Sequence, residues 1–223
     1  MIGYVEVMKP LRVIDLGMIE YEQALSVQLS MVEQRLNGEI EDTLLLLEHN
    51  PVITLGSSGG ADCLLVSEEA LENEGIKLYK TGRGGSITYH GPGQLVGYAI
   101  FDLRQHGKDV HLLLRNLEEV IIDSLSEFGI IGERVSGLTG VWVGGRKICS
   151  EGVAVRKWIS YHGFALNVAP NVTHWGFIHP CGLVGREVTS MSQLLDSAPD
   201  MDEVKLTVAR KCAEVFGLEV VQT

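Results

Sequence analysis

Residues 83–94 read RGGSITYHGPGQ, and no other stretch of the sequence says as much about the fold. A loop needs far less glycine than this merely to turn. Backbone that lacks Cβ atoms can approach a ligand closely and present its N–H groups to it. The alternative is a tight hairpin rich in positive φ angles. The stretch contains neither the GxxxxGK[ST] pattern of a P-loop nor GxGxxG, so a nucleotide-phosphate loop is not indicated.

Upstream of this glycine-rich segment the pattern predicts a helix followed by strands. Apolar residues recur at helical spacing from Tyr21 to Leu36, and Gly38 ends the pattern. The runs 43–49 and 52–56 are short and continuously apolar, which is typical of strands covered on both faces. Ser67 begins a short helix. The upstream third therefore predicts a helix, two buried strands and a second, short helix.

Downstream, the segment 81–103 ends in a long β-like run. Asp109 is expected to cap a helix that closes at Gly129, and three strands are expected over 140–145, 146–155 and 158–168. Asp200 begins a last helix that ends at Gly217. Strands in runs, with helices inserted at intervals, predict an α+β fold: one domain over residues 1–223 with a mixed, mainly antiparallel sheet flanked by helices.

The bulk composition describes an ordinary globular chain. Its 223 residues are 45% hydrophobic, enough for one substantial core. No run approaches the ~20 apolar residues of a membrane span, and Glu6 interrupts the start of the chain, so we expect a cytoplasmic protein that does not enter a membrane. The net charge of −11 disfavours nucleic-acid binding. A monomer is expected, because no apolar stripe is left unassigned.

The histidines and cysteines do not show metal-ligand spacing. Seven histidines are present without HxxxH or HExxH, and none of the four cysteines forms a CxxC pair. We therefore expect no metal site and no cofactor, and no disulfides in a reducing compartment. A GxSxG elbow is also absent, which argues against Ser-His-Asp hydrolysis.

Cys181 is the candidate nucleophile, because it lies between Pro180 and Gly182 on a turn rather than in a core element. A thiol with its ordinary pKa of ~8.5 needs a nearby cation to become a thiolate. Lys147, His179 and His90 are the candidate partners.

The other cysteines are weaker candidates. Cys149 is a rival nucleophile, on the same face as Lys147 if residues 146–152 form a strand. Cys212 falls on the apolar stripe of the last helix, and Cys63 has no evident partner. A lysine at the start of a strand is usually solvated; only burial would lower the pKa of Lys147 enough to make its amine a base.

Four pieces of sequence together resemble the lipoyl(octanoyl) transferase family: RGGSITYHGPGQLVGY, GRKICSEGVAV, SYHGFALNV and the Pro-Cys-Gly turn. Their order and spacing match over roughly residues 45–196. The resemblance implies the fold of biotin and lipoate protein ligase catalytic domains. It also implies transfer of an octanoyl group from octanoyl-acyl carrier protein to a lysine of a lipoyl domain, with a thioester on the enzyme as intermediate. Implied acceptors are the lipoyl domains of 2-oxoacid dehydrogenases and the glycine cleavage H protein.

The resemblance also assigns roles to individual residues. It implies that Cys181 carries the acyl group and that Lys147 transfers protons. The implied substrate-contacting residues fall in three groups: Arg83, Gly84, Gly85, Ser86, Ile87, Thr88, Tyr89 and His90; Ser150, Glu151 and Gly152; and Gly163, Phe164 and Ala165. Glu151 departs from the small or apolar residue expected there, which questions an apolar wall unless its side chain points away.

An acidic chain that receives an acidic carrier protein needs a local basic surface. Arg83, Arg146, Lys147, Arg156 and Lys157 are near the motifs, and we expect them to form a basic rim. The nearest alternative functions are an ATP-dependent lipoate protein ligase and a lipoyl-protein amidotransferase of the same fold. A binding module that has lost its reaction is the alternative from another class. A ligase has no use for a nucleophilic thiol, so Cys181 favours the transferase.

Overall fold

A computed structural model gives the structure of the protein and describes residues 8–59, 61–178 and 187–221. Its elements, in chain order, are β1 (Lys9–Ile19), α1 (Tyr21–Asn37), β2 (Asp42–His49), β3 (Val52–Leu55), η1 (Ala61–Cys63), α2 (Glu68–Asn73), β4 (Lys77–Lys80), β5 (Ile87–His90), β6 (Gln94–Ile100), η2 (Leu103–Gln105), α3 (Val110–Glu127), β7 (Val141–Val143), β8 (Arg146–Arg156), β9 (Ile159–Asn167), η3 (Val172–Phe177), α4 (Met191–Leu194), α5 (Met201–Phe216) and β10 (Leu218–Val221).

A seven-stranded sheet forms the centre of the molecule, in the order β10-β1-β2-β6-β9-β8-β7. β1 runs parallel to both β10 and β2. The remaining pairs, from β2–β6 to β7–β8, are antiparallel. The predicted α+β fold with a mixed, mainly antiparallel sheet is therefore confirmed.

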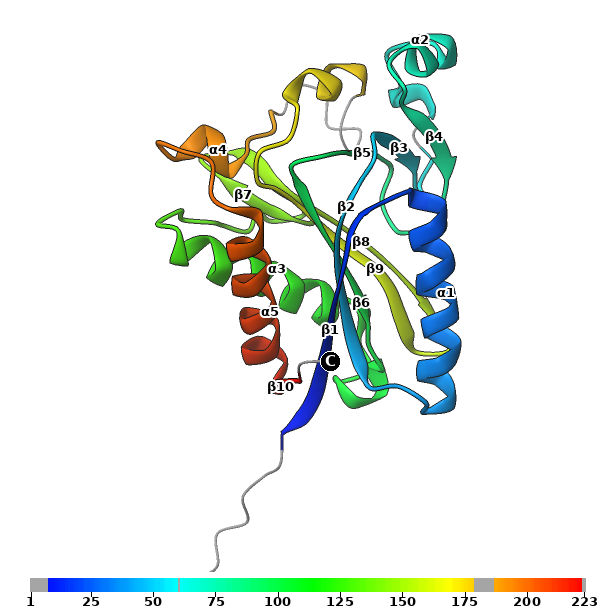
Figure 1. Ribbon diagram of the computed structural model, residues 1–223, viewed down its shortest axis with the longest axis vertical. Helices are drawn as coiled ribbons and strands as arrows, with labels where there is room; N and C mark the ends of the chain where they lie inside the picture. Colours follow the sequence, from blue (N-terminus) through cyan, green and yellow to red (C-terminus); the bar gives the residue numbers. More distant parts are fainter. Residues whose placement is uncertain (1–7, 60, 179–186, 222–223) are drawn as a thin grey trace, which may run out of the picture.

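Helices cover both faces of this sheet. α1 packs on one face and α3 and α5 on the other (Figure 1). Along β2, Leu44 and Leu46 point into the core beneath α3 and α5, whereas Leu45 and Leu47 point into the core beneath α1. Every residue of β2 except Glu48 is buried. This two-sided burial explains why the strand is a continuous apolar run instead of an alternating one.

The predicted helix boundaries are confirmed by their caps. Asp109 accepts hydrogen bonds from the first backbone N–H groups of α3, and Asp200 does the same for α5. The Ser67 side chain caps α2. Gly38 and Gly217 adopt left-handed φ angles of 76° and 64° at the ends of α1 and α5.

The start of the chain differs from the prediction, because the strand β1 precedes the helix. β1 is only partly buried and carries an irregularity of register between Asp15 and Met18, next to Gly17. It therefore shows neither clean alternation nor a continuous apolar run. Its edge-side neighbour β10 was not predicted either, and comes from the opposite end of the sequence.

Three further strands form a separate small sheet in the order β4-β3-β5. Consecutive strands are thus divided between the sheets: β2 and β3 around Pro51, and β5 and β6 around Pro92. The hairpin alternative for residues 83–94 is wrong, because β5 pairs with β3 while β6 pairs with β2 and β9. The glycine-rich segment instead spans the junction between the two sheets.

Candidate active site

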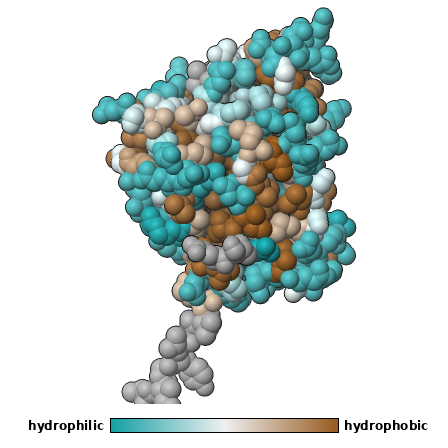
Figure 2. Space-filling view, viewed as in Figure 1, coloured by the Kyte–Doolittle hydropathy of each residue, from teal (hydrophilic) through white to brown (hydrophobic). Residues whose placement is uncertain are grey.

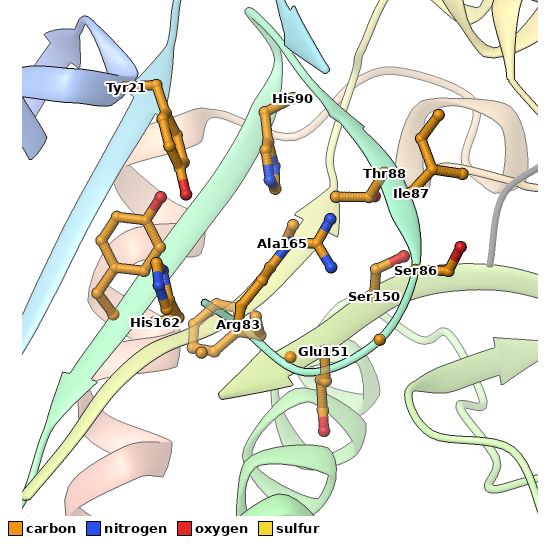
Figure 3. Close-up of a pocket in the computed structure, with 15 residues that line it drawn as sticks. Tyr21, Arg83, Ser86, Ile87, Thr88, His90, Ser150, Glu151, His162 and Ala165 are labelled. Atoms are coloured by element: carbon orange, nitrogen blue, oxygen red, sulfur yellow. The ribbon is translucent and has the colours of Figure 1, made fainter. Parts of the chain in front are cut away.

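A cavity of about 480 Å³, counted to its open mouth, lies at this junction (Figure 3). It is lined by Tyr21, Arg83, Gly85, Ser86, Ile87, Thr88, His90, Tyr98, Ser150, Glu151, Gly152, His162, Gly163, Phe164 and Ala165. Twelve of these positions belong to the predicted substrate-contacting set. Three segments far apart in sequence, around residues 85, 151 and 164, therefore meet at one place.

The glycines allow backbone to pass close to backbone at the base of this cavity. A Cβ on Gly56 would lie 2.3 Å from the Gly85 carbonyl oxygen, and one on Gly152 would lie 2.7 Å from that of Gly84. Gly85 adopts a φ of 82°, which favours glycine. The N–H of Gly84 donates to the Val153 carbonyl at 2.9 Å, which ties the loop to β8. The segment is thus a closely packed wall of the cavity.

Arg83 places a fixed positive charge in this wall. Its Nη2 donates to the Thr54 carbonyl at 2.7 Å and to the Thr54 hydroxyl at 2.8 Å, and Nη1 donates to the Gly84 carbonyl. Only 8% of the residue is exposed. Arg83 therefore cannot belong to a basic surface rim, and neither can Lys147, which is also buried. Arg156 is exposed but pairs with Glu33 at 2.8 Å.

Neutral histidines surround the arginine. Burial lowers the pKa of His49 to about 4, and burial together with the charge of Arg83 lowers that of His162 to about 4. Burial and the neighbouring His49 and Arg83 also hold the pKa of His90 well below its ordinary value. His49 accepts from the Tyr98 hydroxyl at 2.7 Å, since its other ring nitrogen must donate to the Ile19 carbonyl. These rings are therefore hydrogen-bonding groups at neutral pH, not cations.

Three residues that line the cavity were not predicted as site residues: Tyr21, Tyr98 and His162. The tyrosines lay within apolar patterns that indicate core, and the histidine lay inside SYHGFALNV without a distinguishing neighbour. His162 has a left-handed φ of 58°, uncommon for a residue other than glycine. The backbone N–H of His162 donates to the side-chain oxygen of the buried Gln28 of α1 at 2.8 Å. Only contacts across the fold bring these side chains to the cavity.

Glu151 has its carboxyl group directed away from the cavity, towards α3, whereas Ser150 points inward (Figure 3). Strand alternation explains this, because adjacent residues of β8 face opposite sides of the sheet. Both Glu151 carboxyl oxygens are buried and have no hydrogen-bond partner among the described residues. Burial, together with Glu118, raises the pKa of Glu151 well above its ordinary value. The cavity wall is therefore not interrupted by a charge at this position.

Two residues of the predicted set lie elsewhere. The Tyr89 side chain packs in the core of the small sheet, against Trp175, and its hydroxyl lies 2.7 Å from Nδ1 of His174. Gly84 lines a second, neighbouring cavity of about 980 Å³. The two cavities share Gly85, Ser86, Glu151 and Gly152.

Lys147 lines the second cavity. Its Nζ donates to the Thr139 carbonyl at 3.0 Å and lies 5.0 Å from the centre of the Trp142 ring. Only 5% of the residue is exposed, so Lys147 is not solvated as a lysine at the start of a strand usually is. Burial raises the pKa of the neighbouring Cys149 thiol well above its ordinary value. Cys149 is thus a poor source of thiolate. Burial also raises the pKa of Cys212, which lies on α5 in the hydrophobic core, so Cys212 is a poor source of thiolate too.

Cys181 and His179 lie outside the described residues. The described chain on either side of that stretch is held in two places. Ile178 forms a bridge with Leu64, and residues 187–189 run along the start of β8. There the Lys147 N–H donates to the Glu187 carbonyl at 3.0 Å, and the Thr189 N–H donates to the Lys147 carbonyl at 2.9 Å. Residues 187–189 are therefore hydrogen-bonded to the backbone of Lys147 itself.

Within residues 8–59, 61–178 and 187–221, no group of three or more His, Cys, Asp or Glu side chains is arranged to hold a metal ion. The helices of this described part are also too short or too polar to span a bilayer.

Comparison with known proteins decides the family. Residues 20–213 match the family model of the lipoyl protein ligase A/B catalytic domain. The chain belongs to this family. It is 49% identical to the octanoyltransferase of Caldicellulosiruptor saccharolyticus, over 93% of this chain and 89% of that protein. It is 46% identical to the octanoyltransferase of Alkaliphilus metalliredigens, over 96% and 98% of the two chains. Within the family, the chain is an acyltransferase.

Solved structures of ligases with low sequence identity to the chain have the same fold. The bipartite lipoate protein ligase of Thermoplasma acidophilum, studied with its E2 lipoyl domain, superposes with a TM-score of 0.75 at 18% identity, covering 97% of this chain and 87% of that chain. The biotin protein ligase of Aquifex aeolicus superposes with a TM-score of 0.53 at 14% identity, covering 95% and 70%. The predicted likeness to biotin and lipoate ligase catalytic domains is confirmed.

Proposed function

We propose that this acyltransferase moves an octanoyl group from octanoyl-acyl carrier protein to a lysine of a lipoyl domain, through a thioester on Cys181. The acceptors are the lipoyl domains of 2-oxoacid dehydrogenases and the glycine cleavage H protein. The observation that carries the proposal is the buried Lys147, whose backbone binds residues 187–189 just after the cysteine stretch and whose amine lines a cavity beside the glycine-rich wall.

The first half-reaction forms the enzyme thioester. The Cys181 thiolate attacks the carbonyl carbon of the donor thioester, and the bond from that carbon to the carrier sulfur breaks. The departing carrier thiolate takes a proton from the Lys147 ammonium. An amine is suited to this exchange, because general acid-base catalysis contributes ~10²–10⁴-fold when proton donor and acceptor are in contact.

The second half-reaction forms the amide. The acceptor lysine attacks the Cys181 thioester as a neutral amine, the carbon–sulfur bond breaks, and the Cys181 thiolate is regenerated. Lys147, now neutral, removes the proton that the incoming amine must lose. The acyl chain occupies the cavity at the junction of the sheets, where Arg83 and neutral histidines face apolar wall residues such as Ile87 and Ala165. No ATP is consumed, because the donor is already a thioester.

Intact-mass analysis after mixing the enzyme with octanoyl-acyl carrier protein tests the proposal. An octanoyl adduct should form on the parent and on Cys149→Ala, and should be absent from Cys181→Ala. An adduct on Cys181→Ala would overturn the proposed nucleophile. Labelling of a lipoyl domain by free octanoate and ATP, without the carrier protein, would instead support the ligase alternative.

Lys147→Ala should slow both half-reactions in single-turnover measurements. Lys147→Arg is the informative companion, because it keeps the positive charge but does not readily release a proton. Full activity in Lys147→Arg would show that charge alone suffices and would remove the proton-transfer role.

A further inference from the structure

One peptide group separates the Lys147 amine from a buried carboxylate. Lys147 Nζ donates to the Thr139 carbonyl at 3.0 Å, and the N–H of Gly140, in the same peptide, donates to Glu118 Oε1 at 3.1 Å. The carbonyl and the N–H of a trans peptide point in opposite directions. The carboxylate and the ammonium therefore lie on opposite sides of one peptide plane and are joined by two hydrogen bonds.

Glu118 is held rigidly. It lies in the middle of α3 with no exposed surface. Its second oxygen accepts from Arg134 Nε at 2.9 Å and from Arg115 Nη1. These two guanidinium groups balance the negative charge of the carboxylate, and an isolated buried carboxylate would have no such compensation. The position of the Gly140 N–H is thus set by the helix rather than by the loop that carries it.

Gly140 shows that this peptide fits closely against the lysine. Its φ is 110°, in the region that favours glycine. An added Cβ would lie 2.4 Å from the Cys149 carbonyl oxygen and 3.5 Å from Lys147 Cε and Nζ. A side chain at this position would push the peptide away from the lysine, so the glycine is required for the contact.

We propose that Glu118 is a positioning residue: it holds the Thr139–Gly140 peptide so that its carbonyl oxygen fixes the Lys147 amine for proton transfer. This inference rests on the proposed function, in which Lys147 is the proton carrier. A carboxylate at the N–H end strengthens the hydrogen bond at the carbonyl end, because hydrogen bonds in a chain polarise one another. Without Glu118 the peptide can rotate, and the amine loses the acceptor that orients it.

The test compares Glu118→Ala with Glu119→Ala on the same helix. Glu119 also pairs with Arg134, but the Gly140 N–H donates to Glu118 and not to Glu119. We expect Glu118→Ala to lower kcat about 10- to 100-fold, the usual cost of a misplaced catalytic group, with KM for the donor within about 3-fold. Glu119→Ala should change neither. A folded Glu118→Ala with the parent's kcat overturns the inference, as does an equal loss in Glu119→Ala.

One further variant, Glu118→Gln, separates positioning from stability. Glu118→Gln retains an acceptor for the Gly140 N–H, so its kcat should be at least about 10-fold higher than that of Glu118→Ala. If the alanine variant does not fold, the kcat of the glutamine variant should lie within about 10-fold of the parent value. A glutamine variant that folds but is as inactive as Lys147→Ala overturns the inference.

A double-mutant cycle tests whether Glu118 acts through the lysine. In a Lys147→Ala background, Glu118→Ala should lower the residual rate by less than about 2-fold, and a full additive loss overturns the inference. If Lys147→Ala alone keeps the parent rate, the proton-transfer role in the proposed function is wrong, and this conclusion does not depend on any Glu118 variant.

Discussion

Replacement of Glu151 by leucine should stabilise the protein, and by an amount that depends on pH. Both carboxyl oxygens are buried without a partner among the described residues, on the α3 side of β8. A buried polar group left unpaired costs ~1–3 kcal/mol even when neutral. Leucine has a similar size and removes that cost, so the free energy of unfolding should rise by about this amount at pH 5.

The pH dependence follows from the raised pKa of Glu151. Burial and Glu118 raise it above the ordinary value of 4.5, so between pH 4.5 and the raised value the folded state holds a proton that the unfolded state has lost. The contribution of Glu151 to stability therefore falls as the pH rises through this window, by up to ~1.4 kcal/mol per pH unit. From pH 5 to pH 7, the advantage of Glu151→Leu over the parent should grow by up to about 3 kcal/mol.

Urea unfolding followed by tryptophan fluorescence at pH 5, 6 and 7 measures this difference. Glu219→Leu is the matched control, because Glu219 is an exposed glutamate on another strand, β10. The control should show no stabilisation that grows with pH. An advantage of Glu151→Leu that stays constant from pH 5 to pH 7, or a variant less stable than the parent, would refute the reasoning.

Three other predictions follow from the site. Gly97→Ala should destabilise the protein by ~1–3 kcal/mol in urea unfolding, because the added Cβ would lie 2.1 Å from the Phe164 ring. Gly176→Ala is the control and should be near neutral, because an added Cβ there meets nothing within 4 Å. Equal losses of stability in the two variants would contradict the packing argument. The parent should lose stability as the pH falls from 6.5 towards 4, since a histidine of the unfolded state takes up a proton before the buried ring of the folded state does. His162, with its pKa of about 4, contributes about 3 kcal/mol to this loss. His162→Gln should remove that contribution from the pH dependence of the free energy of unfolding measured across this range. An unchanged slope would argue against a buried neutral ring. Arg83→Lys should lower kcat/KM about 10-fold, because an ammonium keeps the charge but cannot reproduce the forked contacts to β3; parent activity in this variant would show that charge alone is needed.

Much of the local structure was predictable from local signals. The caps at Asp109 and Asp200 and the glycines that end α1 and α5 lie where the sequence placed them, because capping depends on a few neighbouring residues. The continuous apolar run of β2 correctly indicated a strand covered on both faces. The strand β1 was missed for a related reason: its partial burial and irregular register leave no clear period.

The site was only partly predictable. The motif resemblance identified most of the residues that line the cavity, but it also included Tyr89, whose side chain faces the opposite core. It could not find Tyr98 or His162, because each reads as an ordinary member of an apolar strand until the strands are paired. The charge argument placed Arg83 in a basic surface rim, whereas the structure buries the guanidinium against Thr54.

The sequence by itself determined the longer helices and the buried strands, the specificity of the 83–94 segment and the family to which the chain belongs. Only the tertiary structure decided that β5 and β6 enter different sheets, that Glu151 points away from the cavity, and that Glu118 reaches Lys147 through one peptide. The physical reason is the range of the interactions. Periodicity and capping act over a few residues, whereas strand pairing, burial and the resulting pKa shifts depend on residues that only the fold brings together.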